Sequence, residues 1–300
     1  MAARVAERES QIVLGLDPDL GALWPQAGVQ LPTDLPPAQL AAAAVLAHCR
    51  ALIDSVGQAC VAVKPQLARF ELLGAAGWAA LEAVVAHARG AGLLVIADAK
   101  RGDIDVTARA YAGALFGGED SPFGRIEGLG ADLATVNPLM GKDAIEPFVS
   151  GARAAGSGVL VLVRTSNPGA ADIEDLTLSE SETVWERLAA LVAELGAPGV
   201  GEAGLSDVGA VVGATEPGHL ERARELMPHT TFLLPGVGVQ GGRVEDLAPA
   251  FAPGPAGGLV SASRSIAGAH HTAGGEPAAA ARAEAERLRE VAWGLRELVR

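Results

Sequence analysis

The chain has 300 residues, of which 49% are hydrophobic and 20% are charged. This length fits one large α/β barrel or two ordinary domains, and the apolar content excludes a disordered chain. The net charge of −13 argues against a general nucleic-acid-binding or anionic-membrane-binding protein, because both need a basic surface. Among 23 basic residues only Lys64, Lys100 and Lys142 are lysines, which points to positions where arginine would not serve.

Cysteine and histidine usage predicts neither a disulfide nor a metal site. Cys49 lies in an apolar helical pattern and Cys60 begins an apolar strand, so we interpret both as buried thiols in a reducing compartment. The six histidines show no HxxxH or HExxH spacing, and the pair His270–His271 lies in a Gly-rich stretch typical of a loop. We expect no signal peptide and no transmembrane helix, since no uninterrupted apolar run reaches about 18 residues. These features predict a cytoplasmic protein.

Short apolar runs recur along the chain and predict eight β-strands. Most runs are continuously apolar, as in strands of a parallel sheet that is covered on both faces. The predicted strands are 12–16, 60–64, 93–97, 132–137, 159–164, 208–213, 231–235 and 258–262.

Segments with helical spacing of apolar residues lie between and after these strands. The predicted helices are 39–56, 74–90, 105–115, 180–195, 217–226 and 277–299, with shorter ones at 143–154 and 242–250. Because each strand is followed by a helix, the pattern predicts a (β/α)8 TIM barrel of the α/β class. A doubly wound open sheet is the alternative, but no GxGxxG motif follows the first strand.

No linker divides the chain, so we expect a single barrel domain over residues 1–300. The Gly/Pro-rich stretches 18–38 and 117–130 are interpreted as loop insertions within that domain. The first insertion follows strand one and could wrap or cover the mouth of the barrel. The segment 277–299 is expected to form a C-terminal helix.

Charged residues gather at the carboxyl ends of the predicted strands, where active sites of such barrels lie. The densest cluster is VIADAKRGDIDVT, residues 95–107. In an extended chain Asp98 and Lys100 point to the same side, about 6.6 Å apart, and Asp103 follows a turn later. Lys64, from the neighbouring strand, would complete an alternating array in which each charge keeps its neighbours ionised. An ordinary salt-bridge network that closes the barrel is the structural alternative.

Two further clusters follow later strands. Glycine-rich PGVGVQGG (235–242) and the string SASR (261–264) predict a phosphate site, because backbone amides and the Arg264 guanidinium both suit phosphate oxygens. A plain Gly-rich turn is the alternative. The string RTSNPGA (164–170) offers Ser166 as a ligand-binding hydroxyl, whereas Asn-Pro-Gly alone signals a turn and Arg164 fits a structural role equally well.

The string VIADAKRGDIDVTA (95–108) resembles the active-site signature of the orotidine 5'-phosphate decarboxylase family throughout. Supporting strings come in the family's order: GLDPD, VAVKPQ, TVNPLMG, TSNPG, PGVGVQGG and SASRSI. The insertions 18–38 and 117–130 look like the larger bacterial branch of the family. The resemblance implies a carboxy-lyase that needs no cofactor or metal and converts orotidine 5'-monophosphate to UMP and CO2 in de novo pyrimidine biosynthesis.

The same resemblance implies a role for each matching residue. Lys100 would protonate the carbon that loses CO2, Asp98 would lie beside the substrate carboxylate, and Lys64 would contact the ribose and the charge array. Ribose hydroxyls would be bound by Asp17, the pyrimidine by Ser166 and Gln240, and the phosphate by Arg264, with Pro235, Gly241, Gly242 and Ser263 also in the substrate site. Asp103, Ile104 and Thr107 would enter the active site of the partner subunit in a homodimer.

Two positions depart from the family pattern. Some members bind the phosphate through a tyrosine in the loop after strand seven, but the only tyrosine here, Tyr111, lies on a predicted helix. Backbone amides near Gly241 and Gly242 would then share that contact. The string TVNPLMG (135–141) carries Leu-Met where the family has an aromatic residue followed by Leu, which concerns packing more than chemistry.

Two other functions stay open from the residues alone. A Mg2+-dependent sugar-phosphate aldolase or decarboxylase of the same barrel superfamily would share the Asp-x-Lys-x-x-Asp core, but it would leave Ser166 and Gln240 without a pyrimidine to bind. A non-catalytic phosphate-binding barrel would have no use for an ammonium group poised between carboxylates.

Overall fold

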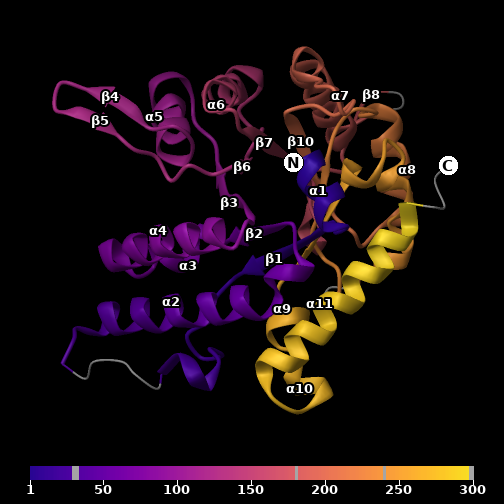
Figure 1. The fold of residues 1–300 in the computed structure, drawn as a ribbon. Coiled ribbons are helices and arrows are strands. Elements are labelled where there is room, and N and C mark those ends of the chain that lie inside the picture. The colour runs from indigo at the N-terminus through magenta and orange to yellow at the C-terminus, as the bar shows by residue number, and fades with distance from the viewer. Residues whose placement is uncertain (29–33, 180–181, 239–240, 297–300) are drawn as a thin grey trace.

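The computed structural model describes residues 1–28, 34–179, 182–238 and 241–296, and its centre is a closed barrel of parallel strands (Figure 1). Each strand pairs with the next one along the barrel, and the last pairs with the first. The barrel strands are β1 Ile12–Leu16, β2 Ala62–Pro65, β3 Leu94–Arg101, β6 Leu133–Val136, β7 Gly158–Arg164, β10 Val208–Val212, β11 Phe232–Leu234 and β12 Gly258–Ala262. Each lies within or overlaps a predicted run, so the predicted TIM barrel is confirmed and the open sheet is excluded.

Alternation along the strands divides the apolar core into two layers. Val13, Ile96 and Leu160 belong to a cluster inside the barrel. Ile12 and Leu14 belong to the larger cluster between the barrel and its helices. Because both faces are covered, the strands are apolar throughout, which explains why they could be predicted from continuous apolar runs.

The outer layer consists mainly of helices that follow the predicted segments. The long ones are α2 Pro37–Val56, α4 Gly74–Gly90, α5 Asp105–Leu115, α6 Lys142–Ala154, α7 Val184–Gly196, α8 Pro217–Leu226 and α11 Pro277–Gly294. Shorter helices are α1 Ala2–Arg8, α3 Leu67–Glu71, α9 Arg264–Ala267 and α10 His270–Ala273. Single 3-10 turns are η1 Pro25–Gly28, η2 Gly57–Ala59, η3 Pro168–Asp172, η4 Ala197–Gly199 and η7 Pro255–Gly257.

Two predicted helices differ from the observed ones in physically simple ways. The predicted helix 242–250 is wrong, because the segment forms only the 3-10 turns η5 Val244–Asp246 and η6 Ala248–Phe251. Pro249 lacks an amide N–H and disfavours the helical conformation of the residue before it. Helix α7 begins at Val184, where Thr183 and Glu186 form a reciprocal capping box. The last residues of the predicted helix 277–299 lie partly outside the described residues.

The two insertions contain more structure than the sequence predicted. Within 117–130, β4 Glu119–Ser121 and β5 Gly124–Ile126 form an antiparallel hairpin that projects beside α5 (Figure 1). Outside these insertions, β8 Thr177–Ser179 pairs antiparallel with β9 Glu182–Thr183. Within 18–38, Trp24 is buried, and its indole N–H donates to the carbonyl oxygen of Ala267 in α9 at 2.8 Å. The first insertion is therefore tied to the helix that follows the last barrel strand.

One described segment, Pro37–Ala59, is long and apolar enough to cross a membrane by length and composition, with a mean hydropathy of 1.4. In the fold this segment is α2 together with η2. It packs beside α4 and α11 (Figure 1), and its buried face includes Val45, Leu52 and Ile53. Its apolar character therefore matches its place in the outer layer of the barrel.

Candidate active site

A cavity of about 820 Å³ opens at the carboxyl ends of the barrel strands. It gathers side chains that are far apart in the sequence, since every parallel strand ends at the same rim. The predicted site residues that line it are Asp17, Lys64, Asp98, Lys100, Ser166, Pro235, Ser263 and Arg264. The barrel topology thus brings together most of the site residues named from the sequence.

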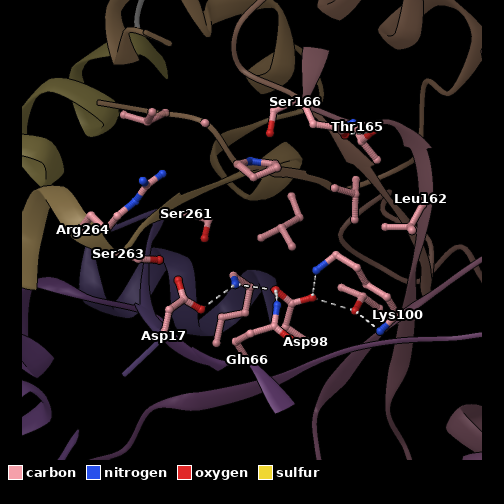
Figure 2. A pocket seen from close by; sticks show the side chains of 18 of the residues that line it. Asp17, Gln66, Asp98, Lys100, Leu162, Thr165, Ser166, Ser261, Ser263 and Arg264 are labelled. Carbon is pink, nitrogen blue, oxygen red and sulfur yellow. Dashed lines mark hydrogen bonds and ion pairs between the residues drawn. The ribbon is translucent and has the colours of Figure 1, made fainter. Parts of the chain in front are cut away.

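Asp98 is the centre of the charged cluster in this cavity. Its Oδ2 lies 2.6 Å from Lys64 Nζ, and its Oδ1 lies 2.5 Å from Lys100 Nζ (Figure 2). Asp17 Oδ1 lies 3.9 Å from Lys64 Nζ and extends the alternation of charges. The cation–anion–cation order predicted from Lys64, Asp98 and Lys100 is therefore present in the structure.

Burial and pairing act in opposite directions on these charges. Burial alone would lower the pKa of Lys64, but the carboxylates of Asp98 and Asp17 outweigh it and raise that pKa above its ordinary value. Burial alone would raise the pKa of Asp98, but the ammonium groups of Lys64 and Lys100 hold that pKa below its usual range. Lys64 and Asp98 are therefore ionised at neutral pH although both are buried.

The backbone of β3 departs from a regular strand at this cluster. Ala97 pairs with Ala134 and Arg101 with Val136, so the register shifts by two residues between them. Lys100 has a φ of 46°, in the left-handed region that residues with a side chain rarely adopt. Asp98 and Lys100 do both point into the cavity, as predicted, but a bulge places them there and not a straight extended chain.

Two uncharged residues that the sequence reasoning did not single out complete the surroundings of Asp98. Gln66 Nε2 donates to Asp98 Oδ2 at 3.2 Å, and Thr135 Oγ1 donates to Asp98 Oδ1 at 3.0 Å. Gln66 follows Lys64 by two positions, and Thr135 is the polar residue of an otherwise apolar strand. These positions near strand ends were the features of the sequence that could have identified Gln66 and Thr135 as site residues.

The turn after β7 brings Ser166 and Thr165 to the cavity rim (Figure 2). Arg164 is buried and makes a bidentate ion pair with Asp175 at 2.9 and 3.0 Å, which establishes its structural role. Glu174 accepts hydrogen bonds from the Thr165 backbone N–H at 2.8 Å and from its hydroxyl at 3.0 Å. The turn that carries Ser166 is therefore fixed by side chains that the sequence reasoning did not assign.

The opposite rim follows β11 and β12, where Arg264 begins α9 and is exposed. β1 and β12 approach so closely here that a Cβ on Gly15 would lie 1.7 Å from Ser263 Oγ. The amide N–H of Gly241 donates to Gly238 at 2.8 Å, and that of Gly242 donates to Gly236 at 3.0 Å. Both amides proposed for the phosphate are thus engaged within the loop, and binding through them requires these bonds to open. Gln240 lies outside the described residues.

Three predicted residues stand apart from the cavity of their own chain. Asp103, Ile104 and Thr107 are not part of its lining, and Ile104 and Thr107 are exposed. The Asp103 carboxylate accepts a hydrogen bond from the backbone N–H of Ile104 at 2.8 Å. Within one described chain, Asp103 therefore does not join the array of Lys64, Asp98 and Lys100.

Potential metal ligands are scattered through the described part of the structure. In the part of the chain that the structure describes, no three or more His, Cys, Asp or Glu side chains are grouped to hold a metal ion. Cys49 and Cys60 are free and buried, and burial raises the pKa of both thiols. Neither thiol is therefore a ready nucleophile or metal ligand.

Comparison with known proteins assigns the chain to a family. Residues 10–283 match the model of the orotidine 5'-phosphate decarboxylase / HUMPS family. The orotidine 5'-phosphate decarboxylase of Rhodopirellula baltica is 44% identical over 232 residues, which cover 76% of this chain and 74% of that protein. The one from Deinococcus radiodurans is 43% identical over 265 residues, which cover 88% of this chain and 86% of that protein.

A solved structure agrees with this assignment at the level of the fold. OMP decarboxylase of Leishmania donovani superposes with a TM-score of 0.71 at 31% identity and covers 99% of this chain and 98% of its own. The family match extends over the barrel strands and the residues that line the cavity. The chain belongs to the orotidine 5'-phosphate decarboxylase / HUMPS family.

Proposed function

We propose that this protein is an orotidine 5'-phosphate decarboxylase that converts orotidine 5'-monophosphate to UMP and CO2 in pyrimidine biosynthesis. The single observation that carries the proposal is the Lys64–Asp98–Lys100 array at the barrel mouth, in which Lys64 and Asp98 are buried. The relatives with 43–44% identity that bear this name support the same activity.

The reaction breaks the bond between a pyrimidine ring carbon and its carboxylate, and the bonding electrons stay on that carbon as CO2 leaves. This carbanion has no obvious electron sink in the ring. An ammonium group fixed beside it stabilises the developing negative charge and then supplies the proton. Lys100 suits this task, because its Nζ is held by Asp98 at 2.5 Å and its side chain is 46% exposed toward the cavity. The resulting neutral amine regains its proton from solvent.

Lys64 and Asp98 have complementary tasks in this proposal. Asp98, beside the substrate carboxylate, disfavours the ground state and favours the loss of CO2. Lys64 keeps Asp98 ionised and, with Asp17, borders the part of the cavity proposed for the ribose. Arginine holds its proton too tightly to donate it, which accounts for lysine at position 100.

The phosphate is proposed to bind at the opposite rim, where Arg264, Ser263, Pro235 and the Gly241–Gly242 turn lie. Ser166 and Gln240 are proposed to contact the pyrimidine. Phosphate lies far from the reacting carbon, so its binding energy would contribute by holding the ring against the charge array and by closing the loop around it.

The direct test is the absorbance of orotidine 5'-monophosphate during incubation with the purified protein, with and without EDTA. We expect turnover that EDTA does not change. Absence of turnover would contradict the decarboxylase assignment, and turnover that EDTA abolishes would favour a Mg2+-dependent reaction of the same barrel superfamily.

We also propose a homodimer in which Asp103, Ile104 and Thr107 enter the active site of the partner subunit. The support is that these residues lie outside the cavity of their own chain, while Ile104 and Thr107 are exposed beside the start of α5. Lys100→Ala and Asp103→Ala subunits, each inactive alone, should regain about a quarter of the activity of the unaltered protein after mixing. Random pairing makes about half of the dimers mixed, and each mixed dimer has one intact site of its two. No recovery after verified subunit exchange would count against shared sites.

Two further expectations complete the proposal. We propose that residues 1–300 fold as one domain, because the insertions 18–38 and 117–130 pack on the barrel or project from it and form no separate core in the described residues. A cytoplasmic location is supported by two free, buried cysteines, which suit a reducing compartment. A single cooperative unfolding transition and cell fractionation test these points.

A further inference from the structure

We infer that Thr135 is a positioning residue for the proposed decarboxylation, because its hydroxyl holds the β3 bulge that presents Asp98 and Lys100 to the substrate. The inference rests on the proposed function and extends it to a residue outside the charged array. Thr135 lies on β6, is 1% exposed and borders the cavity.

Thr135 lies opposite the bulge of β3. β3 and β6 pair regularly as far as Ala97 and Ala134 and resume at Arg101 and Val136. Thr135 is therefore the one residue of β6 that faces the extra residues of β3. At this position the side chain of Thr135 takes over the pairing that the backbone ladder cannot make.

The Thr135 hydroxyl makes two hydrogen bonds. Thr135 Oγ1 accepts from the backbone N–H of Lys100 at 2.9 Å and donates to Asp98 Oδ1 at 3.0 Å. A threonine hydroxyl has a single proton, which is used in the hydrogen bond to the carboxylate. The oxygen lone pairs can then accept the hydrogen bond from the amide. The hydroxyl thus joins the backbone of the proposed proton donor to the carboxylate that holds its ammonium group.

This bridge maintains an uncommon backbone conformation at Lys100. Lys100 has a φ of 46°, which residues with a Cβ avoid unless their surroundings impose it. The Lys100 side chain returns to Asp98 Oδ1 at 2.5 Å, so the backbone and side-chain contacts of Lys100 close a ring through Thr135 and Asp98. Without the hydroxyl, the Lys100 amide and Asp98 each lose a partner, and the bulge is free to relax toward a regular strand.

Removal of the Thr135 hydroxyl should lower the rate of the chemical step and leave substrate binding nearly unchanged. A displacement of the ammonium group by about 1 Å suffices to lower a rate by about 100-fold. The groups proposed for the ribose, pyrimidine and phosphate lie on other strands, so the KM for orotidine 5'-monophosphate should change little.

The experiment compares Thr135→Val, which keeps the shape and removes the hydroxyl, with Thr135→Ser, which keeps the hydroxyl. We expect Thr135→Val to lower kcat by about 10- to 100-fold with KM within about threefold, and Thr135→Ser to recover most of the lost kcat. Thr231→Val is the matched control. Thr231 is equally buried, and its hydroxyl donates to Ala256 at 3.1 Å at the other end of the barrel, so its loss should leave kcat unchanged.

Equal kcat values for the valine and serine variants would overturn the inference, as would a loss confined to KM or an equal loss in Thr231→Val. If Thr135→Val does not fold, Thr135→Ala provides the same comparison. A crystal structure of the variant adds a readout that does not depend on activity: we expect φ of Lys100 to leave the left-handed region, and an unchanged bulge would contradict the inference. Absence of turnover in the unaltered protein would instead reject the proposed function and leave this structural readout intact.

Discussion

The two rims of the barrel mouth differ in how their charged groups are paired and buried. On the rim formed by β2, β3 and β6, Lys64 and Asp98 are buried and every charge of the array has a partner. On the rim formed by β11 and β12, Arg264 is exposed and lies apart from the charged cluster (Figure 2), and its guanidinium pairs with none of the residues that the structure describes. The charges of the proposed reacting end are paired within the protein, whereas the arginine of the proposed phosphate end is exposed.

This difference matches what each end has to do. Electrostatic stabilisation of a transition state is most effective when charges are already fixed, because no reorganisation is then needed during the reaction. Contacts to the phosphate contribute to catalysis in another way. The binding energy that they release, far from the reacting carbon, can be used to hold the substrate at the reacting groups. In the structure, the Gly241 and Gly242 amides donate to carbonyl oxygens of their own loop.

The largest effect is expected on the rim formed by β2, β3 and β6. Asp98→Asn removes the anion between two ammonium groups, so kcat should fall by about 1,000-fold or more. The measurement is kcat with orotidine 5'-monophosphate. Asp54→Asn is the control, because Asp54 is an exposed carboxylate that contacts His87 on the outer helices. Similar kcat values for the two variants would remove the distinction between the rims.

A smaller effect of a different kind is expected on the rim formed by β11 and β12. Arg264→Ala should raise KM by about 10- to 100-fold, since hydrogen bonds to charged groups contribute about 1.5–3 kcal/mol. The fold-change in kcat should be smaller than the fold-change in KM. Inorganic phosphate should inhibit the variant more weakly than it inhibits the unaltered protein. An effect on kcat alone would place Arg264 with the reacting groups instead.

A buried histidine of α2 contacts the insertion 18–38. His48 Nδ1 accepts the backbone N–H of Trp24 at 3.0 Å, and burial lowers the pKa of His48 to about 4. The unfolded chain takes up this proton below about pH 6.5 and the folded chain only near pH 4, so stability is lost as pH falls between these values. The loss amounts to about 3 kcal/mol for His48.

His48→Asn keeps an acceptor near the Nδ1 position and does not titrate. Its free energy of unfolding, measured by denaturant titration from pH 7 to pH 4, should therefore fall less steeply than that of the unaltered protein. If the free energies of unfolding of the two proteins fall in parallel from pH 7 to pH 4, His48 is not held neutral by its burial in the folded state.

The smallest effect is expected for the third lysine. Lys142 begins α6 and reaches Glu194 of α7 at 2.6 Å on the exposed surface. Exposed pairs of this kind contribute little, so Lys142→Ala should leave kcat and KM within about twofold. A large loss of activity would mean that all three lysines, and not two of them, belong to the chemistry.

Much of the fold was predictable because its determinants are local. Continuous apolar runs identified the barrel strands, and residues at strand ends identified Lys64, Asp98 and Lys100. The bulge at Lys100 was not predictable in this way, because it depends on a hydroxyl of a neighbouring strand at Thr135. The role of Arg164 likewise required its partner Asp175, which reaches it from another turn.

The remaining errors have equally specific causes. Apolar spacing over 242–250 suggested a helix, but Pro249 limits the segment to 3-10 turns. The hairpin in 117–130 consists of two three-residue strands, which are too short to give a periodic signal. Asp103 could be named from the string but not placed, since its proposed site lies in a second subunit.

The most direct test of the account is the rate of orotidine 5'-monophosphate decarboxylation by Lys100→Ala compared with that of the unaltered protein, followed by absorbance at saturating substrate. The account assigns both charge stabilisation and the proton to Lys100, so it predicts that the unaltered protein turns over and that the variant is slower by at least about 1,000-fold. A variant that decarboxylates the substrate within about tenfold of the unaltered rate would contradict it.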